Sequence, residues 1–144
     1  MPETLRIAPQ SIDPDMVRVM IVDDQPVFRE VARSLLESDG QFDVVAEAAA
    51  GRDAVDLVPE VQPDVVIMDI QMDDMSGIEA TRRILGLCPE ATVVLTSMTA
   101  EREYPRLVRE IGALGFIAKR NLNGTALRSI LGMGPGPLPA AMAA

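Results

Sequence analysis

The stretch that decides the fold is MVRVMIVDDQPVFREVARSLLESDG, residues 16–40. Its first seven residues, 16–22, are mostly apolar and β-branched, which predicts a buried strand. Pro26 suits the first turn of a helix, and the apolar residues after it recur at helical spacing. The stretch therefore predicts one strand–helix unit, with Asp23 and Asp24 at the junction.

The same alternation of strand and helix continues along the chain. Further strands are predicted at residues 43–48, 65–69, 92–96 and 115–118, and further helices at 51–58, 76–87, about 103–111 and 122–131. Pro59 is expected to close the second helix, and Pro105 is expected to delay the start of the fourth. Such alternation predicts an α/β fold in which right-handed crossovers connect the strands of one parallel sheet.

Composition excludes several classes of site. The chain has 144 residues with no histidine and one cysteine, so a Ser-His-Asp triad, a histidine zinc site and an internal disulfide are all excluded. The formal charge of −9 argues against a nucleic-acid partner. No apolar run is long enough to span a membrane, and no signal peptide is recognisable, so we expect a cytoplasmic protein without a membrane contact.

The chain divides into one domain and two flanking segments. Residues 1–16 contain three prolines and little periodicity, and we expect them to form a loose N-terminal extension. Residues 17–131 form the domain. Residues 132–144 are rich in Gly and Pro, and we expect a disordered tail.

Carboxylates follow two of the predicted strands. Asp23 and Asp24 come after the first strand, and Asp69 ends the third. In a sheet of order 2-1-3-4-5 these strands are neighbours, and ligands bind at the carboxyl ends of such strands. Three converging carboxylates repel one another unless a hard cation lies among them, and Mg²⁺ is the cation that prefers such oxygen ligands.

Two further polar groups reach the same edge. Ser97 follows the fourth strand, and Lys119, the only lysine in the chain, follows the fifth. A transferred phosphoryl group needs cationic and hydrogen-bonding donors around its oxygens, and an aspartate can accept it as a nucleophile. The sequence therefore predicts a site for phosphoryl chemistry.

Four stretches together resemble the receiver domain of response regulators in two-component signal transduction. They are IVDDQPVFREVARSLLE, PDVVIMDIQMDDMSGIEATRRI, VVLTSMTAERE and GALGFIAKR, and the resemblance covers about residues 17–131. It implies a flavodoxin-like (βα)5 fold with a doubly wound, five-stranded parallel sheet of order 2-1-3-4-5. The sequence is most similar to receivers that precede a helix-turn-helix DNA-binding domain. We nevertheless expect no such output domain here.

The resemblance assigns roles to the carboxylates. Asp69 matches the phospho-acceptor. Asp24 matches a direct Mg²⁺ ligand, and Asp23 matches its partner, which often acts through water. Gln71 occupies the position whose backbone carbonyl is a further Mg²⁺ ligand in the family.

The resemblance also assigns the groups that respond to phosphorylation. Lys119 matches the phosphate-binding lysine, and Phe116 matches the aromatic residue whose rotamer reports phosphorylation. Ser97 matches the switch hydroxyl, and it is preferred to Thr96 because its spacing to Lys119 fits the family better.

The implied function is a phosphorylation switch. A sensor histidine kinase or a phosphotransfer protein supplies the phosphoryl group, and the changed surface acts on an unidentified downstream protein. A homodimer through the segments 103–111, 115–118 and 122–131 is also compatible with the family. We do not expect an enzyme, because aspartate-nucleophile phosphatases place a second aspartate where this chain has Gln71.

Departures from the family pattern leave alternatives open. Asp73 stands where proline is frequent, Asp74 adds another charge, and Met98 replaces a small residue. These residues keep open a receiver-like interaction module that works without phosphorylation. The Gly/Pro tail also resembles a linker, so the chain could instead be the receiver half of a longer transcription factor.

Overall fold

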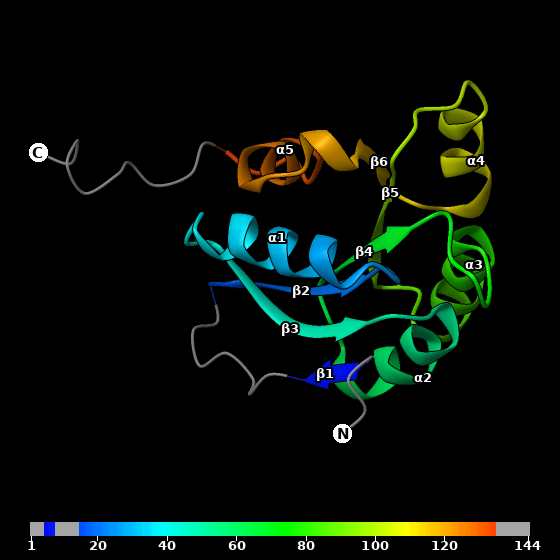
Figure 1. The fold of residues 1–144 in the computed structure, drawn as a ribbon, viewed down its shortest axis with the longest axis horizontal. Helices are drawn as coiled ribbons and strands as arrows, with labels where there is room; N and C mark the ends of the chain where they lie inside the picture. The colour runs from blue at the N-terminus through cyan, green and yellow to red at the C-terminus, as the bar shows by residue number, and fades with distance from the viewer. Residues whose placement is uncertain (1–4, 8–14, 135–144) are drawn as a thin grey trace, which may run out of the picture.

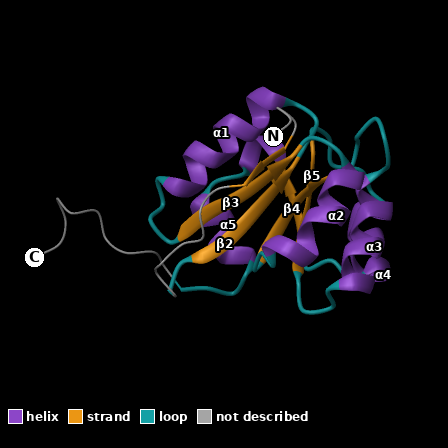
Figure 2. Ribbon diagram, turned by 90° about the horizontal axis from the view of Figure 1, so that it is seen from below, coloured by secondary structure: helices purple, strands orange, loops and turns teal. Residues whose placement is uncertain are grey.

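The computed structural model describes residues 5–7 and 15–134. A single sheet lies between two layers of helices: α1 and α5 cover one face, and α2, α3 and α4 cover the other (Figures 1 and 2). The strands are β1 Leu5–Ile7, β2 Val17–Val22, β3 Phe42–Ala48, β4 Val65–Asp69, β5 Thr92–Ser97 and β6 Gly115–Ala118. The helices are α1 Pro26–Glu37, α2 Gly51–Val61, α3 Gly77–Leu87, α4 Tyr104–Ile111 and α5 Gly124–Ile130, with a 3₁₀ turn at Lys119–Asn121.

The sheet has the order β1-β3-β2-β4-β5-β6. Strands β2 to β6 are parallel to one another and correspond to the predicted order 2-1-3-4-5, so the predicted flavodoxin-like fold is confirmed. Strand β1 was not predicted; it adds to the outer edge of the sheet, antiparallel to β3. The rest of the expected extension, apart from residues 15 and 16, and most of the expected tail lie outside the described residues.

Two prolines have different effects on their helices. Helix α4 begins at Tyr104 with Pro105 in its first turn, as predicted. The prediction that Pro59 closes the second helix is wrong, because α2 continues to Val61. Pro59 removes one backbone donor near the end of the helix, but the Gln62 amide still bonds the Val58 carbonyl at 2.8 Å, and buried Val61 secures the last turn.

Strand alternation divides the core between the two faces of the sheet. In β4, Val65 and Ile67 pack towards α1 and α5, whereas Val66 and Met68 pack towards α2, α3 and α4. Both faces of the sheet are buried, as expected for parallel strands. Within the described part of the chain, no helix is long and apolar enough to cross a membrane.

Candidate functional site

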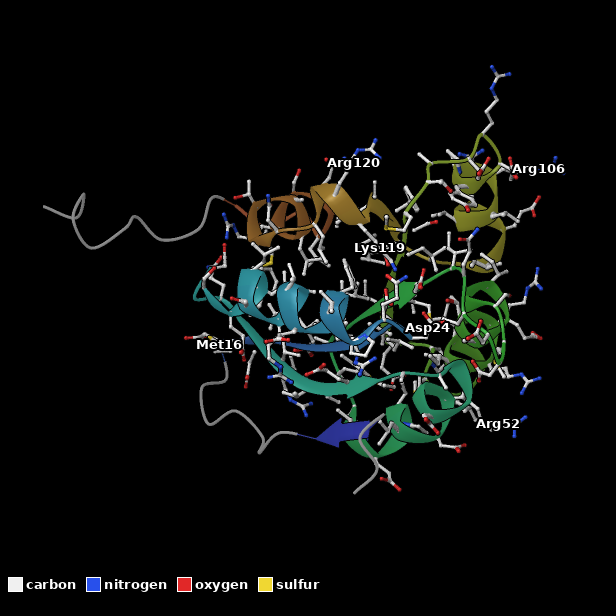
Figure 3. All side chains as sticks on the ribbon, viewed as in Figure 1. Met16, Asp24, Arg52, Arg106, Lys119 and Arg120 are labelled. Carbon is white, nitrogen blue, oxygen red and sulfur yellow. The ribbon has the colours of Figure 1, made fainter. Side chains whose placement is uncertain are left out.

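Three carboxylates meet at the carboxyl ends of β2 and β4. Each of Asp23, Asp24 and Asp69 offers an oxygen that lies within 4.8 Å of the oxygens offered by the other two. Asp23 and Asp69 are buried, and Asp24 is half-buried, so the cluster is open to solvent on the Asp24 side. Figure 3 shows Asp24 and Lys119 at this same edge of the sheet. The structure thus brings together the three aspartates that the sequence selected.

Lys119 lies directly against two of these carboxylates. Its Nζ is 2.7 Å from Asp23 Oδ2 and 3.3 Å from Asp69 Oδ2. The same ammonium lies 4.7 Å from the centre of the Phe28 ring, which extends from α1. Because an aromatic face attracts a cation, Phe28 helps to hold Lys119 over the cluster.

Burial, and after it the neighbouring charge of Asp23, raise the pKa of Asp69 to about 6. The charge of Lys119 and the Gln71 amide, which donates to Asp69 Oδ1 at 3.2 Å, partly oppose this rise in pKa. The ionised form of Asp69 is therefore destabilised in the folded protein. A cation beside it would relieve that destabilisation.

The donor set fits Mg²⁺. Three carboxylates are balanced by the one ammonium of Lys119, which leaves an excess of negative charge when all three are ionised. All three are hard oxygen donors, and Mg²⁺ is held by one or two carboxylates while it keeps several waters. Because Asp24 is only half-buried, solvent reaches this side of the cluster. The side chain of Gln71 is exposed, and its backbone amide lies at Asp69.

The loop after β4 is held close to Asp69 by a glycine. The Gly77 amide donates to the Ile70 carbonyl at 2.8 Å. A Cβ at Gly77 would collide with the carbonyl oxygen of Asp69 and lie 2.9 Å from the Cα of Ile70. The role of Gly77 is not predicted from the sequence, because it depends on a close backbone approach that periodicity does not reveal.

Ser97 and Thr96 are both buried at the end of β5. Thr96 pairs in register with Asp69, whereas Ser97 alternates to the face occupied by Leu95. Phe116 pairs with Leu95 and packs on that same face, where its ring lies 5.2 Å from that of Tyr104 in α4. Strand alternation therefore places Ser97, and not Thr96, on the face of Phe116.

The added acidic residues do not act as one group. Asp74 accepts hydrogen bonds from the amides of Gly51 at 3.0 Å and Arg52 at 2.9 Å, at the first turn of α2. Desolvation acts to raise the pKa of Asp74. The hydrogen bonds from backbone amides have the larger combined effect, so the pKa of Asp74 is lowered. The Asp74 charge is therefore engaged with a helix N-terminus. Asp73 is exposed, and Met98 is 64% exposed beside Ser97.

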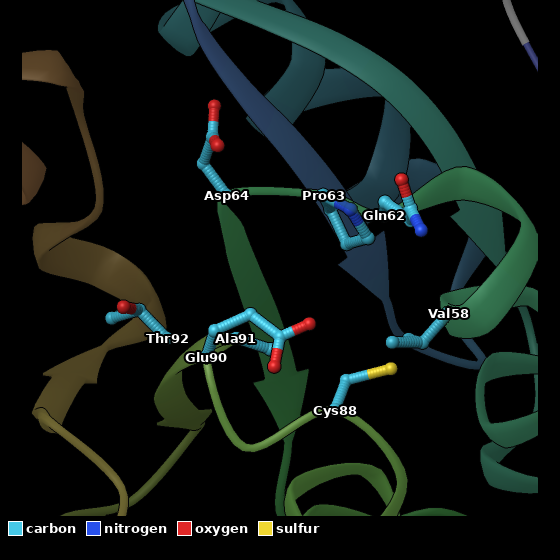
Figure 4. A pocket seen from close by; sticks show the side chains of 8 residues that line it. All are labelled: Val58, Gln62, Pro63, Asp64, Cys88, Glu90, Ala91 and Thr92. Carbon is cyan, nitrogen blue, oxygen red and sulfur yellow. The ribbon is translucent and has the colours of Figure 1, made fainter.

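A pocket lies at the opposite end of the sheet (Figure 4). Asp64 and Thr92, at the start of β4 and β5, line it together with Cys88 and Val58. Because the carboxylates lie at the other ends of these strands, this pocket is separate from the candidate site.

Known proteins resemble this chain in sequence and in fold. Residues 19–131 match the family profile described as the response regulator receiver domain. A solved two-component response regulator of the LuxR family from Aurantimonas sp. SI85-9A1 is 33% identical, with a TM-score of 0.74, over 82% of this chain and 87% of that chain.

Curated relatives include longer proteins. The transcriptional regulatory protein DegU from Brevibacillus brevis is 34% identical over 76% of this chain and 47% of its own length. A protein-glutamate methylesterase/protein-glutamine glutaminase from Photobacterium profundum is 37% identical over 72% of this chain and 27% of its own length. The chain thus spans half or less of the length of these relatives.

Proposed function

The chain belongs to the response regulator receiver domain family, and from this premise we propose that it accepts a phosphoryl group on Asp69 in a reaction that requires Mg²⁺. The observation that carries the proposal is the position of Asp69 between Asp23, Asp24 and Lys119. We propose that the domain acts as a stoichiometric acceptor rather than as an enzyme.

In the proposed transfer, a carboxylate oxygen of Asp69 attacks the phosphorus of a phosphohistidine. A new O–P bond forms, the N–P bond breaks, and the imidazole of the donor takes up a proton. Asp23, Asp24, Asp69 and the backbone of Gln71 would hold Mg²⁺, which neutralises charge on the phosphoryl oxygens when it is bound. The ammonium of Lys119, already 3.3 Å from Asp69, offers a second positive charge to those oxygens.

Ser97 is proposed to transmit the change to the surface. Its hydroxyl now accepts a hydrogen bond from the Thr99 amide at 3.3 Å. We propose that the O–H of Ser97 donates to a phosphoryl group on Asp69, whose charged oxygens are strong acceptors. Since Phe116 lies on the same face and contacts Tyr104, a shift of Ser97 can alter the surface formed by α4, β6 and α5, through which a partner or a second copy would bind.

The phosphodonor is proposed to be a sensor histidine kinase or a phosphotransfer protein. These 144 residues contain no histidine, so a phosphohistidine donor must lie outside this domain. Val27, Val31 and Leu35 form an exposed apolar stripe along α1, beginning three residues after Asp24. Their exposure next to the site suits a docking surface for the donor.

A second candidate is the receiver part of a longer regulator. It is favoured by the lengths of the relatives, since this chain matches 47% of DegU and 27% of the methylesterase. The downstream activity would then belong to a further domain. Reading the gene beyond codon 144 decides between the two candidates.

Acetyl phosphate tests the proposal without a cognate kinase. With acetyl phosphate and Mg²⁺, we expect the intact mass of the protein to increase by one phosphoryl group, and we expect no increase when EDTA removes the metal. If the mass is unchanged with Mg²⁺, the chain is instead an interaction module that works without phosphorylation.

Binding of Mg²⁺ should release a proton at low pH. Because the pKa of Asp69 is raised to about 6, this carboxyl is largely protonated below pH 6 and must lose its proton to bind the metal. We therefore expect weaker Mg²⁺ binding below pH 6, with release of about one proton, and no release well above it. Calorimetry in buffers of different ionisation enthalpy measures the released proton. An equal release below pH 6 and well above it would contradict the role of Asp69 as a metal ligand with a raised pKa.

A further inference from the structure

Arg29 is a buried arginine of α1 that contacts the backbone of the acidic cluster. Its side chain donates from Nη1 to the carbonyl oxygen of Asp23 at 2.7 Å. Resting on the function proposed above, we propose that Arg29 is a positioning residue: it fixes the backbone of Asp23 so that the cluster is preformed for a divalent cation.

The Asp23 carbonyl lies just beyond the end of β2, where the ladder of the sheet stops. The amide of Asp23 still bonds the Ala48 carbonyl of the neighbouring strand, at 3.0 Å. Arg29 then supplies a donor to the Asp23 carbonyl. The charge on the guanidinium makes this hydrogen bond stronger than one from a neutral donor.

Arg29 is itself held in place by a buried acid. Its Nε lies 3.4 Å from Oε1 of Glu47, a β3 residue that is 7% exposed. Arg33, one helical turn later, holds the other oxygen of Glu47 at 2.7 and 2.8 Å. Glu47 therefore compensates the buried charge of Arg29 and limits the positions that its guanidinium can take.

The carboxylate of Asp23 depends on the same short segment. Asp23 Oδ1 accepts from the Gln25 amide at 2.9 Å, and Oδ2 faces Lys119 at 2.7 Å. The Gln25 carbonyl in turn accepts the backbone amide of Arg29 at 3.2 Å. A shift of the Asp23 backbone would therefore move its carboxylate away from the other two aspartates.

The test compares Arg29→Met with Arg33→Met. Both variants remove a cation from Glu47, but only Arg29 contacts Asp23. We expect Arg29→Met to weaken Mg²⁺ binding, measured by calorimetry, by about 10–100-fold, as is typical when a group that orients metal ligands is lost. We expect Arg33→Met to bind within about threefold of the wild type, and Arg29→Lys to recover part of the affinity, because lysine keeps one charged donor.

A second readout needs no metal. Amide hydrogen exchange of Gln25, followed by NMR in the metal-free protein, reports the hydrogen bond to Asp23 Oδ1. We expect its protection to fall about tenfold or more in Arg29→Met and to change little in Arg33→Met. Equal protection in the two variants, or equal Mg²⁺ affinity, would overturn the proposal.

The two readouts separate this inference from the proposed function. If the wild type binds no Mg²⁺, the proposed function fails, and the exchange of Gln25 still decides whether Arg29 positions this segment. If Arg29→Met does not fold, Arg29→Lys carries both measurements. Wild-type affinity and protection in Arg29→Lys would then contradict the proposal, because one ammonium cannot reproduce the bridge between Asp23 and Glu47.

Discussion

Asp69→Asn should accept no phosphoryl group from acetyl phosphate and Mg²⁺, and it should be more stable than the wild type at neutral pH. The amide is not a nucleophile for this reaction, so the gain in mass should disappear. The gain in stability follows from the pKa of Asp69, which burial and the charge of Asp23 raise to about 6.

The direction of the stability effect follows from proton binding. Between the ordinary aspartate pKa and pH 6, the folded protein holds a proton on Asp69 that the unfolded chain releases, so folding stability falls as pH rises through this window. Asparagine avoids the ionisation. We expect it to raise the free energy of unfolding by about 2–3 kcal/mol above pH 6, and the gain should shrink towards pH 4.

Asp73→Asn is the matched control for Asp69→Asn. It removes the same charge from an exposed residue in the loop that follows Asp69, so phosphorylation should persist and stability should change by less than about 0.5 kcal/mol. Urea denaturation over a range of pH and intact-mass spectrometry measure the two effects. A phosphoryl group gained by Asp69→Asn would contradict the assignment of the acceptor.

Gly77→Ala should damage both the fold and the site. The added Cβ would collide with the carbonyl of Asp69, and because its neighbours are backbone atoms they cannot move aside cheaply. We expect a loss of about 3 kcal/mol in the free energy of unfolding. In the fraction that still folds, displacement of Asp69 should slow phosphorylation by about 100-fold.

Gly86→Ala in the same helix is the control for Gly77→Ala. A Cβ at Gly86 would meet no atom within 4 Å, so alanine should leave stability unchanged or raise it by up to about 1 kcal/mol. Thermal unfolding measures the difference in stability between the two variants. Wild-type stability and phosphorylation in Gly77→Ala would show that the loop after β4 can relax away from Asp69.

The fold could be predicted from the sequence because local patterns and burial agree. The apolar run 65–68, which ends in Asp69, marks a strand covered on both faces, and helical periodicity places helices between the strands. Strand β1 escaped prediction because it is three residues long and depends on pairing with β3. The length of α2 was also missed, since tertiary packing of Val61 outweighs the effect of Pro59.

Only part of the candidate site could be predicted from the sequence. Residues at strand ends, such as Asp23, Asp69 and Lys119, could be selected because the topology of a parallel sheet brings those ends together. Arg29 and Phe28 could not be selected, since their roles depend on which face of α1 packs over the site. Asp74 looked like a further charge at the site, and only tertiary structure pairs it with the start of α2.

The most direct test of the central claim is to locate the phosphoryl group chemically. Borohydride reduces an aspartyl phosphate to homoserine, and peptide mass spectrometry then identifies the modified residue. After treatment with acetyl phosphate and Mg²⁺, we predict homoserine at position 69, and we predict none when the metal is chelated. Homoserine at Asp23, Asp24 or Asp73 in place of Asp69, or at no position, would contradict the account.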